Sequence, residues 1–291
     1  MEFISTLLGG LSSGGTYAMI ALGYTMVYGI AKMLNFAHGD IIMVGGYILY
    51  IMMLKLSQNI FVGVLVAVLF CVLLGITVER LAYRPLRGAS PLAVLITAIG
   101  VSYLLQSVAQ LIFGSKSQAV TITTAKMVKI ASAEFNLNTI LTLVVGAIIM
   151  IVLTLFIKFT RTGRAMQAVS EDRGAAQLMG VNVNKIIMIT FAIGSALAAC
   201  AGVFYLMQIP SVSPTLGSMP GIKAFAAAVI GGIGSIPGAM LGGVLLGVVE
   251  KLALSVPVLA PYANAIVFAL LIIILLVRPI GLLGKKRREK V

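Results

Sequence analysis

The chain has 291 residues, of which 60% are hydrophobic and only 10% are charged, and its mean hydropathy is +1.12. A soluble domain carries about 25% charged residues because water must cover its surface, so this composition excludes a soluble globular protein. A helical span needs about 20 apolar residues, so the chain has room for about seven to nine spans and little else. The net charge of +13 is attributed to basic cytoplasmic loops rather than to nucleic-acid binding.

The beginning of the chain predicts a membrane span that is retained in the protein. Glu2 is followed by no Lys or Arg before Lys32, so the basic region that opens a secretory signal peptide is absent. Cys71 and Cys200 both fall inside apolar runs, so neither a disulfide framework nor a metal site is predicted.

Apolar runs of spanning length follow one another along the whole chain. A further stretch, 222–256, is longer and is interrupted by GGIGSIPG at 231–238. The predicted fold is an all-α, polytopic transmembrane bundle of about eight segments that forms a single domain over 1–291. The runs lie at 5–31, 39–56, 60–79, 91–113, 139–159, 186–207 and 259–277.

Most of the basic residues fall on one side of the membrane if the spans alternate. They gather at Lys32, in 79–88, in 158–185 and in the tail after Arg278. This side is predicted to be cytoplasmic, with the C-terminus inside and the N-terminus outside.

If the spans alternate and the C-terminus is inside, the broken stretch must begin and end on the outer side of the membrane. We therefore predict that 222–256 is either a re-entrant hairpin or two short spans. Interrupted segments rich in Gly and Pro indicate transport pathways, so Gly232, Gly234 and Pro237 are pathway candidates. A plain helix–helix turn near the inner surface is the alternative, and the GxxxG spacing of 234–247 favours close helix packing.

The segment NFAHGD (35–40) places polar groups between the first two apolar runs. Polar residues at membrane depth are costly and suggest function, and His38 is the only histidine. The structural alternative, slightly favoured by the sequence, is that Asn35 or Asp40 caps a helix end.

The segment SEDRGAAQLMGV (170–181) predicts one short cytoplasmic helix. Ser170 is the expected N-cap, Glu171 and Asp172 suit the positive end of the helix dipole, and Gly180 suits a left-handed C-terminal position. Exposed apolar residues rimmed by charge suggest a docking site, although the helix could instead lie against its own membrane domain. The apolar residues concerned are Ala175, Ala176, Leu178 and Met179.

The chain shows no means of using ATP. No phosphate-binding loop is found, because GLLGKK (281–286) has the wrong spacing. The spans carry no evident relay of charged residues, and Glu79, Glu250 and Lys251 are interpreted as interfacial charges. No catalytic residue is predicted, so the energy for transport must come from elsewhere.

The sequence resembles the permease subunits of branched-chain amino-acid ABC importers along nearly its whole length. The blocks that carry the resemblance are ALGYTMVYGI (21–30), NFAHGD (35–40), ER-x-x-YRPLR (79–87), TAIGVSYLLQ (97–106), RTGRAMQAVSEDRGAAQLMGV (161–181), TFAIGSALAACAGV (190–203), KAFAAAVIGGIGSIPGAMLGG (223–243) and RPIGLLG (278–284).

The resemblance implies a multi-pass protein of the cell (inner) membrane that works in a complex. Its partners would be a second similar permease, two cytoplasmic ATPase subunits that bind ATP and Mg, and an external substrate-binding protein. It also implies that 160–185 is the segment that couples to the ATPases and that NFAHGD lies on the pathway. The coupling candidates are Glu171, Asp172, Ala175, Ala176 and Gly180, and the further pathway candidates are Asn35, His38 and Gly39.

The resemblance implies ATP-driven import of leucine, isoleucine and valine. A related importer for urea or short amides is the nearest alternative. A secondary transporter or channel that works without partners, and an anchoring subunit without a transport role, belong to other functional classes. Transport by this chain alone would indicate a partner-independent transporter or channel. Unchanged transport after changes in GGIGSIPG would indicate an anchoring subunit.

Overall fold

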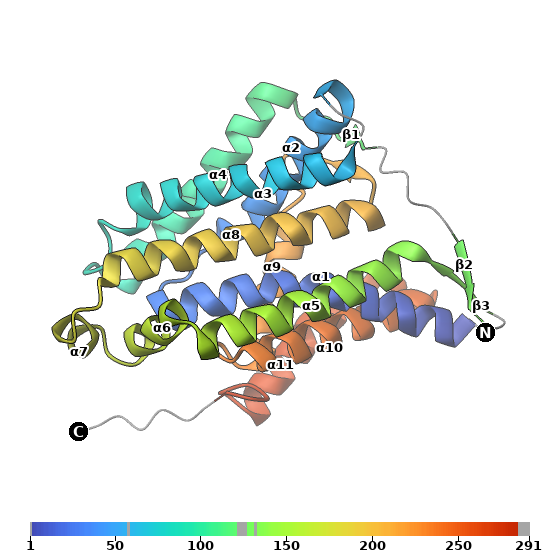
Figure 1. Ribbon diagram of the computed structural model, residues 1–291. Coiled ribbons are helices and arrows are strands. Elements are labelled where there is room, and N and C mark those ends of the chain that lie inside the picture. Colours follow the sequence, from blue (N-terminus) through green and yellow to red (C-terminus); the bar gives the residue numbers. More distant parts are fainter. Residues whose placement is uncertain (1, 57–58, 121–126, 131–132, 285–291) are drawn as a thin grey trace.

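The computed structural model describes residues 2–56, 59–120, 127–130 and 133–284. Within these ranges the chain is mostly helical, and the long helices run side by side along one direction (Figure 1). The helices are α1 (Glu2–Ala31), α2 (His38–Ile51), α3 (Ile60–Val78), α4 (Pro91–Phe113), α5 (Leu137–Phe159), α6 (Arg161–Glu171), α7 (Arg173–Leu178), α8 (Val183–Gln208), α9 (Ser218–Gly231), α10 (Ile236–Ser255) and α11 (Ala263–Val277).

Short elements extend or connect these helices. Single π-helical segments follow α2 at Met52–Leu56 and α3 at Glu79–Tyr83, and a 3₁₀ turn at Ala260–Tyr262 precedes α11. Strand β1 (Gln118–Ala119) pairs antiparallel with β4 (Ser211–Val212), and β2 (Met127–Ile130) pairs antiparallel with β3 (Ala133–Asn136).

Several helix boundaries follow from local sequence signals. The Ser90 side chain accepts a hydrogen bond from the Ala93 amide at 3.3 Å, Pro91 occupies the first turn of α4, and Gly114 ends it with φ +79°. Serine at the N-cap, proline in the first turn and glycine after the end are the preferred residues at these positions. The apolar run at 91–113 is therefore a helix with the predicted boundaries.

Helix α1 lies at the centre of the bundle, in contact with α5, α8, α9 and α10. Glycines allow α1 and α10 to approach closely, since a Cβ at Gly247 would lie 2.2 Å from the Gly14 nitrogen and one at Gly243 would lie 2.4 Å from the Ala18 nitrogen. Small residues at this spacing let helix backbones meet in a membrane. The packing interpretation of the GxxxG spacing is thus confirmed.

Six helices are long and apolar enough to cross a membrane, among the residues that the structure describes. They lie at Ile60–Tyr83, Pro91–Phe113, Thr139–Phe159, Val183–Gln208, Ile236–Ser255 and Ala260–Val277. Bulky apolar side chains such as Phe61 (82% exposed) and Leu111 (86% exposed) project from the bundle, as expected of a surface covered by lipid or a partner. A polytopic helical bundle is confirmed, whereas the expected count of about eight segments is not.

The expected first span differs from these six. Helix α1 has 30 residues, but Gly, Ser, Thr and Tyr residues lower its hydropathy. Its side chains from Ser12 onward are largely buried by neighbouring helices. Small and hydroxyl residues are typical of contacts between membrane helices, which accounts for the composition of α1.

The interrupted stretch forms α9 and α10, joined by a turn at residues 232–235. Gly232 and Gly234 adopt φ of +102° and +94°, a region that glycine enters without steric cost. The C-terminal segment packs on this turn, since the amides of Leu282 and Leu283 donate to the carbonyls of Ile230 and Gly231 at 2.8 and 3.0 Å.

The two ends of the bundle differ in charge. The N-terminus and β1 lie at one end, whereas α6, α7 and the C-terminal segment lie at the other (Figure 1). The end of α1 also lies beside α7, because the Arg173 guanidinium donates to the carbonyl of Ala31. The basic segments therefore gather at the α7 end, although residues 285–291 of the basic tail lie outside the described part of the chain.

Candidate functional site

The polar side chains of NFAHGD connect separate helices. The Tyr83 hydroxyl donates to Asn35 Oδ1 at 2.8 Å, and the Gln106 amide donates to Asp40 Oδ1 at 2.8 Å. Ala37 occupies the N-cap of α2, where no side-chain cap bond forms. The favoured prediction that Asn35 or Asp40 caps a helix is therefore wrong, because more distant partners take their side chains.

His38 fills a slot between α1 and α8. It is 1% exposed, and its ring meets the Tyr24 ring edge-on at a centroid distance of 4.7 Å. A Cβ at Gly23 would lie 2.3 Å from His38 Nε2, and one at Gly194 would lie 3.7 Å from Cε1. Nε2 has no hydrogen-bond partner among the described residues.

Gly39 brings the first turn of α2 against the start of α9. A Cβ at Gly217 would lie 1.8 Å from the Gly39 carbonyl oxygen, and one at Gly221 would lie 2.9 Å from the Gly39 Cα. No side chain other than hydrogen fits between the two backbones at Gly217. The two helices α2 and α9 therefore begin next to each other.

This meeting point lies partway along α1. Gly23, which contacts His38, precedes the last residue of α1 by eight positions, and at 1.5 Å per residue this places it about 12 Å from the helix end. The non-helical segments before α2 and α9 therefore reach into the bundle. Such backbone is tolerated at membrane depth only where protein buries it or where it lines a water-filled path.

The GGIGSIPG turn lies nearer the end of α1. A Cβ at Gly29 would lie 3.3 Å from the Gly234 Cα. Gly232 is buried, whereas Gly234 and Pro237 are exposed, and Pro237 lies in the first turn of α10. Both predicted pathway motifs thus contact α1 and α9, at different positions along them. Their role in transport stays a prediction.

A buried ion pair joins α9 to α10. Lys223 Nζ lies 2.7 Å from Glu250 Oε1, and the two side chains are only 8% and 13% exposed. Lys223 Nζ also lies 6.0 Å from the centroid of the Tyr17 ring. Glu250, interpreted from the sequence as an interfacial charge, is therefore one half of a buried ion pair, and its position relative to the membrane interface stays a prediction. The missed signal was Lys223, a single charge within an apolar stretch.

The segment predicted to be cytoplasmic forms two helices instead of the single one predicted. Thr160 caps α6 by accepting from the Gly163 amide at 2.9 Å, and Asp172 caps α7 by accepting from the Ala175 amide at 3.0 Å. Ser170 lies in the last turn of α6, so its prediction as the N-cap is wrong. Asp172 has extended backbone, with φ −150° and ψ 115°, which ends α6 and starts α7.

The exposed side of this segment is smaller than predicted. Ala176 is 4% exposed and packs into the hydrophobic core, whereas Leu178 and Met179 are 90% and 84% exposed. Gly180 has φ +81°, as its predicted left-handed position requires. The exposed residues form what we call the α7 surface: Glu171, Asp172, Gly174, Ala175, Gln177, Leu178, Met179 and Gly180.

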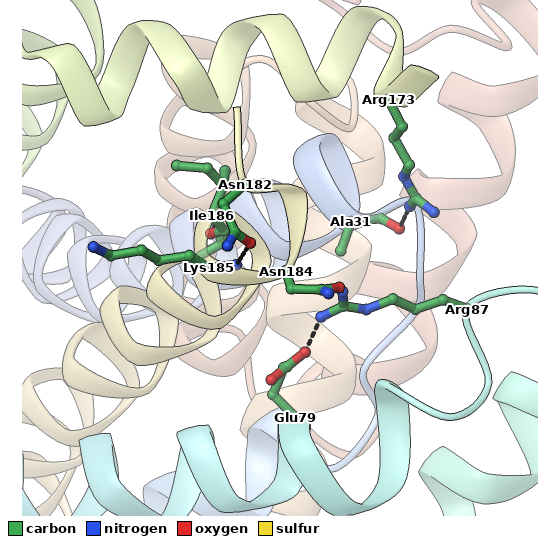
Figure 2. A network of polar contacts seen from close by, with 9 residues as sticks. Ala31, Glu79, Arg87, Arg173, Asn182, Asn184, Lys185 and Ile186 are labelled. Carbon is green, nitrogen blue, oxygen red and sulfur yellow. Dashed lines mark hydrogen bonds and ion pairs between the residues drawn. The ribbon is translucent and has the colours of Figure 1, made fainter. Parts of the chain in front are cut away.

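A polar network holds α7 against the membrane helices (Figure 2). Arg173 donates to the carbonyl of Ala31 at the end of α1, while Arg87 donates to Glu79 and to Asn184 of α8. Glu79, interpreted as interfacial from the sequence, is only 2% exposed and pairs with Arg87. The Arg173 contact ties α7 to α1, and the Arg87 contacts beside it tie the segment after α3 to α8, so α7 is not an independent loop.

Comparisons with known proteins give consistent matches along the chain. The family described as "Branched-chain amino acid transport system / permease component" matches residues 6–276. The high-affinity branched-chain amino acid transport system permease protein BraD of Pseudomonas aeruginosa is 44% identical, over 100% of this chain and 98% of its own length. The corresponding LivH proteins of Salmonella typhimurium and Escherichia coli are 42% and 41% identical with the same coverage.

One solved structure shows a loose likeness. PsaBC from Streptococcus pneumoniae in complex with Fab aligns with 94% of this chain and 89% of that chain, with a TM-score of 0.44 and 17% sequence identity.

Proposed function

This chain belongs to the family of permease components of branched-chain amino-acid transport systems, and from that membership we propose that it translocates leucine, isoleucine and valine in an ATP-driven importer. The observation that carries the proposal is the match over the full chain to relatives named as high-affinity branched-chain amino-acid permeases. These relatives do not favour the urea or short-amide alternative.

The complex that we propose contains four kinds of subunit. A second similar permease completes the membrane domain, two cytoplasmic ATPase subunits bind ATP and Mg, and an external binding protein delivers the amino acid. This chain contributes no catalytic residue in the proposal. The α7 surface supports ATPase docking, because Leu178 and Met179 are large apolar side chains left almost fully exposed.

We further propose that the chain forms one permease domain in the cell (inner) membrane, with its α7 end in the cytoplasm. The N-terminus is then outside and the C-terminus inside. The gathering of basic residues at the α7 end supports this orientation. In the proposal α1 and α2 also enter the membrane, which gives about eight segments.

In this orientation α9 and α10 form a hairpin that begins and ends toward the outer side of the membrane. Its turn reaches the cytoplasmic end of α1, because Gly234 lies against Gly29. The 14 residues of α9 span about 21 Å, less than the hydrocarbon core of about 30 Å. Helix α9 therefore begins inside the membrane, next to the start of α2.

The pathway proposal rests on this interior meeting of two helix starts. Interrupted helices at mid-membrane are typical of substrate pathways in transporters. The conformation described here closes that region, since Asn35 and His38 are 3% and 1% exposed. Opening therefore requires α2 and α9 to separate at Gly39 and Gly217, and the ATPases would drive this change through α7.

The substrate is tested by reconstituting the permease with its cognate ATPase subunits and binding protein in liposomes. We expect leucine to stimulate ATP hydrolysis and uptake, and urea to do neither. Stimulation by urea but not by leucine would refute the substrate assignment. Uptake by this chain alone, without ATP, would instead establish a partner-independent transporter or channel.

Docking is tested by placing a charge on the α7 surface. Leu178→Asp is expected to abolish substrate-stimulated ATP hydrolysis while leaving the membrane fold intact, because the side chain is exposed. Val258→Asp is the matched control, since Val258 is 77% exposed and lies in the loop between α10 and α11, remote from α7 (Figure 1). Equal substrate-stimulated ATP hydrolysis in the two variants would refute the docking role of the α7 surface.

A further inference from the structure

Two adjoining hollows lie beside α7 and share the side chains of Arg87 and Arg173. The first, of about 310 Å³, lies between the end of α1 and the segment that leads into α4. The second, of about 490 Å³, lies between α7 and the start of α8. We call the two together the Arg87–Arg173 pocket.

The walls of this pocket carry positive charge only. Among the described residues that line it, the charged ones are Lys32, Arg87 and Arg173. Glu79 partners Arg87 but is 2% exposed and does not line either hollow. Arg87 Nε has no hydrogen-bond partner in the described part of the chain. Glu79 balances Arg87, so the pocket lacks an anion to balance the partly buried guanidinium group of Arg173 among the residues that the structure describes.

The electrostatics of Arg173 agree with this imbalance. Burial, and secondarily the charge of Arg87, lower the pKa of the Arg173 guanidinium. An anion between the two arginines would relieve their mutual repulsion, and arginine binds carboxylates with two parallel hydrogen bonds. The geometry thus favours a small anionic group that enters from the cytoplasmic side.

We propose that the Arg87–Arg173 pocket receives an Asp or Glu side chain of an ATPase subunit docked on α7. This inference rests on the proposed function. An ATPase side chain is favoured because the pocket is continuous with the α7 surface: Gly180 belongs to both, and Leu178 follows the pocket residue Gln177. A protein that covers Leu178 and Met179 therefore also covers the pocket opening.

The position of Arg173 gives this contact a consequence for the membrane helices. Its guanidinium has five N–H donors, so it can hold the Ala31 carbonyl and an incoming carboxylate at once. The ATPase is then connected through one side chain to the end of α1. From there the chain runs directly into NFAHGD.

Two variants test the proposal, and each lowers the net charge by one. Arg173→Gln removes a guanidinium from the pocket. Gln177→Glu adds a carboxylate to the wall, and the described hydrogen bonds include none from the Gln177 side chain, so this variant keeps the network intact. Lys116→Gln is the matched control, because Lys116 is exposed and lies two residues before β1, at the other end of the bundle (Figure 1).

The measurement is the affinity of the full-length permease in nanodiscs for its purified ATPase subunit. We expect Arg173→Gln and Gln177→Glu each to weaken binding about tenfold, equivalent to about 1.4 kcal/mol, and Gln177→Lys to strengthen it. Lys116→Gln is expected to match the wild type. The wild-type affinity is also expected to fall more steeply with salt than that of Arg173→Gln.

Three results would overturn the inference, and the third would also overturn the proposed function. Binding of Gln177→Glu with wild-type affinity would show that no carboxylate enters the pocket, whatever the stability of Arg173→Gln. Loss of the wild-type permease's affinity for the ATPase in phosphatidylglycerol nanodiscs, but not in phosphatidylcholine nanodiscs, would assign the pocket to the phosphate of an anionic lipid. Failure of the wild type itself to bind the ATPase would refute the proposed function, not only the pocket.

Discussion

Replacing Glu250 by Gln is expected to destabilise the protein more than any change on its surface. The ion pair with Lys223 has an N–O distance of 2.7 Å. At an effective dielectric constant of about 20, Coulomb's law gives an attraction of about 6 kcal/mol at this distance. The desolvation of the two charges costs several kcal/mol per ion, so the intact pair contributes little net stability.

The single variant changes that balance because it removes one charge and leaves the other. Lys223 would stay buried between α9 and α10 without its partner, at an expected cost of about 3–5 kcal/mol. The double variant Lys223→Met with Glu250→Leu removes both charges and keeps similar volumes. It is expected to lie within about 1 kcal/mol of the wild type.

Reversible unfolding in mixed detergent micelles, followed by circular dichroism, measures the free energies of unfolding of the wild type and of these variants. Glu171→Gln is the control, because Glu171 is an exposed carboxylate and its loss is expected to change the free energy of unfolding by less than about 0.5 kcal/mol. A cost below about 1 kcal/mol for Glu250→Gln would refute the reasoning. So would a double variant as unstable as the single one.

Two further predictions concern the packing around NFAHGD, both measured as the free energy of unfolding. Tyr83→Phe is expected to cost about 1–3 kcal/mol, because Asn35 loses the hydroxyl that donates to it; an unchanged stability would show that Asn35 finds another donor. Gly217→Ala is expected to cost at least about 1–3 kcal/mol, because its Cβ would overlap the Gly39 carbonyl. Gly100→Ala, where a Cβ meets nothing within 4 Å, is expected instead to stabilise α4 by about 0.5–1 kcal/mol, and equal effects of the two would contradict the packing account.

Hydrophobic patterning predicted the helices well because lipid and protein both demand apolar surface over the length of a span. The interruption between α9 and α10 was also predictable, since Gly232 and Gly234 occupy backbone conformations that other residues avoid. Local capping rules were less successful. They assigned Asn35 and Asp40 to nearby backbone, but both side chains bond to partners on other helices, Tyr83 and Gln106.

Partners far apart in the sequence carry no local signal. Lys223 and Glu250 are 27 residues apart, and Arg173 meets Ala31 across 142 residues. Which polar groups meet is decided by helix packing. The sequence therefore predicted helical structure in 170–181 but not the pocket beside it. The break at Asp172 escaped prediction because the residues on both sides of it favour a helix.

The enclosed position of α1 has a consequence for how the protein is made. This helix is translated before α8, α9 and α10, which cover much of it and lie within residues 183–255. Until they are synthesised, the glycine and hydroxyl groups of α1 face lipid or the insertion machinery, where polar groups are costly. Helix α1 is therefore translated well before its stable surroundings exist, and chains that stop before α8 are expected to be substrates for membrane quality-control proteases.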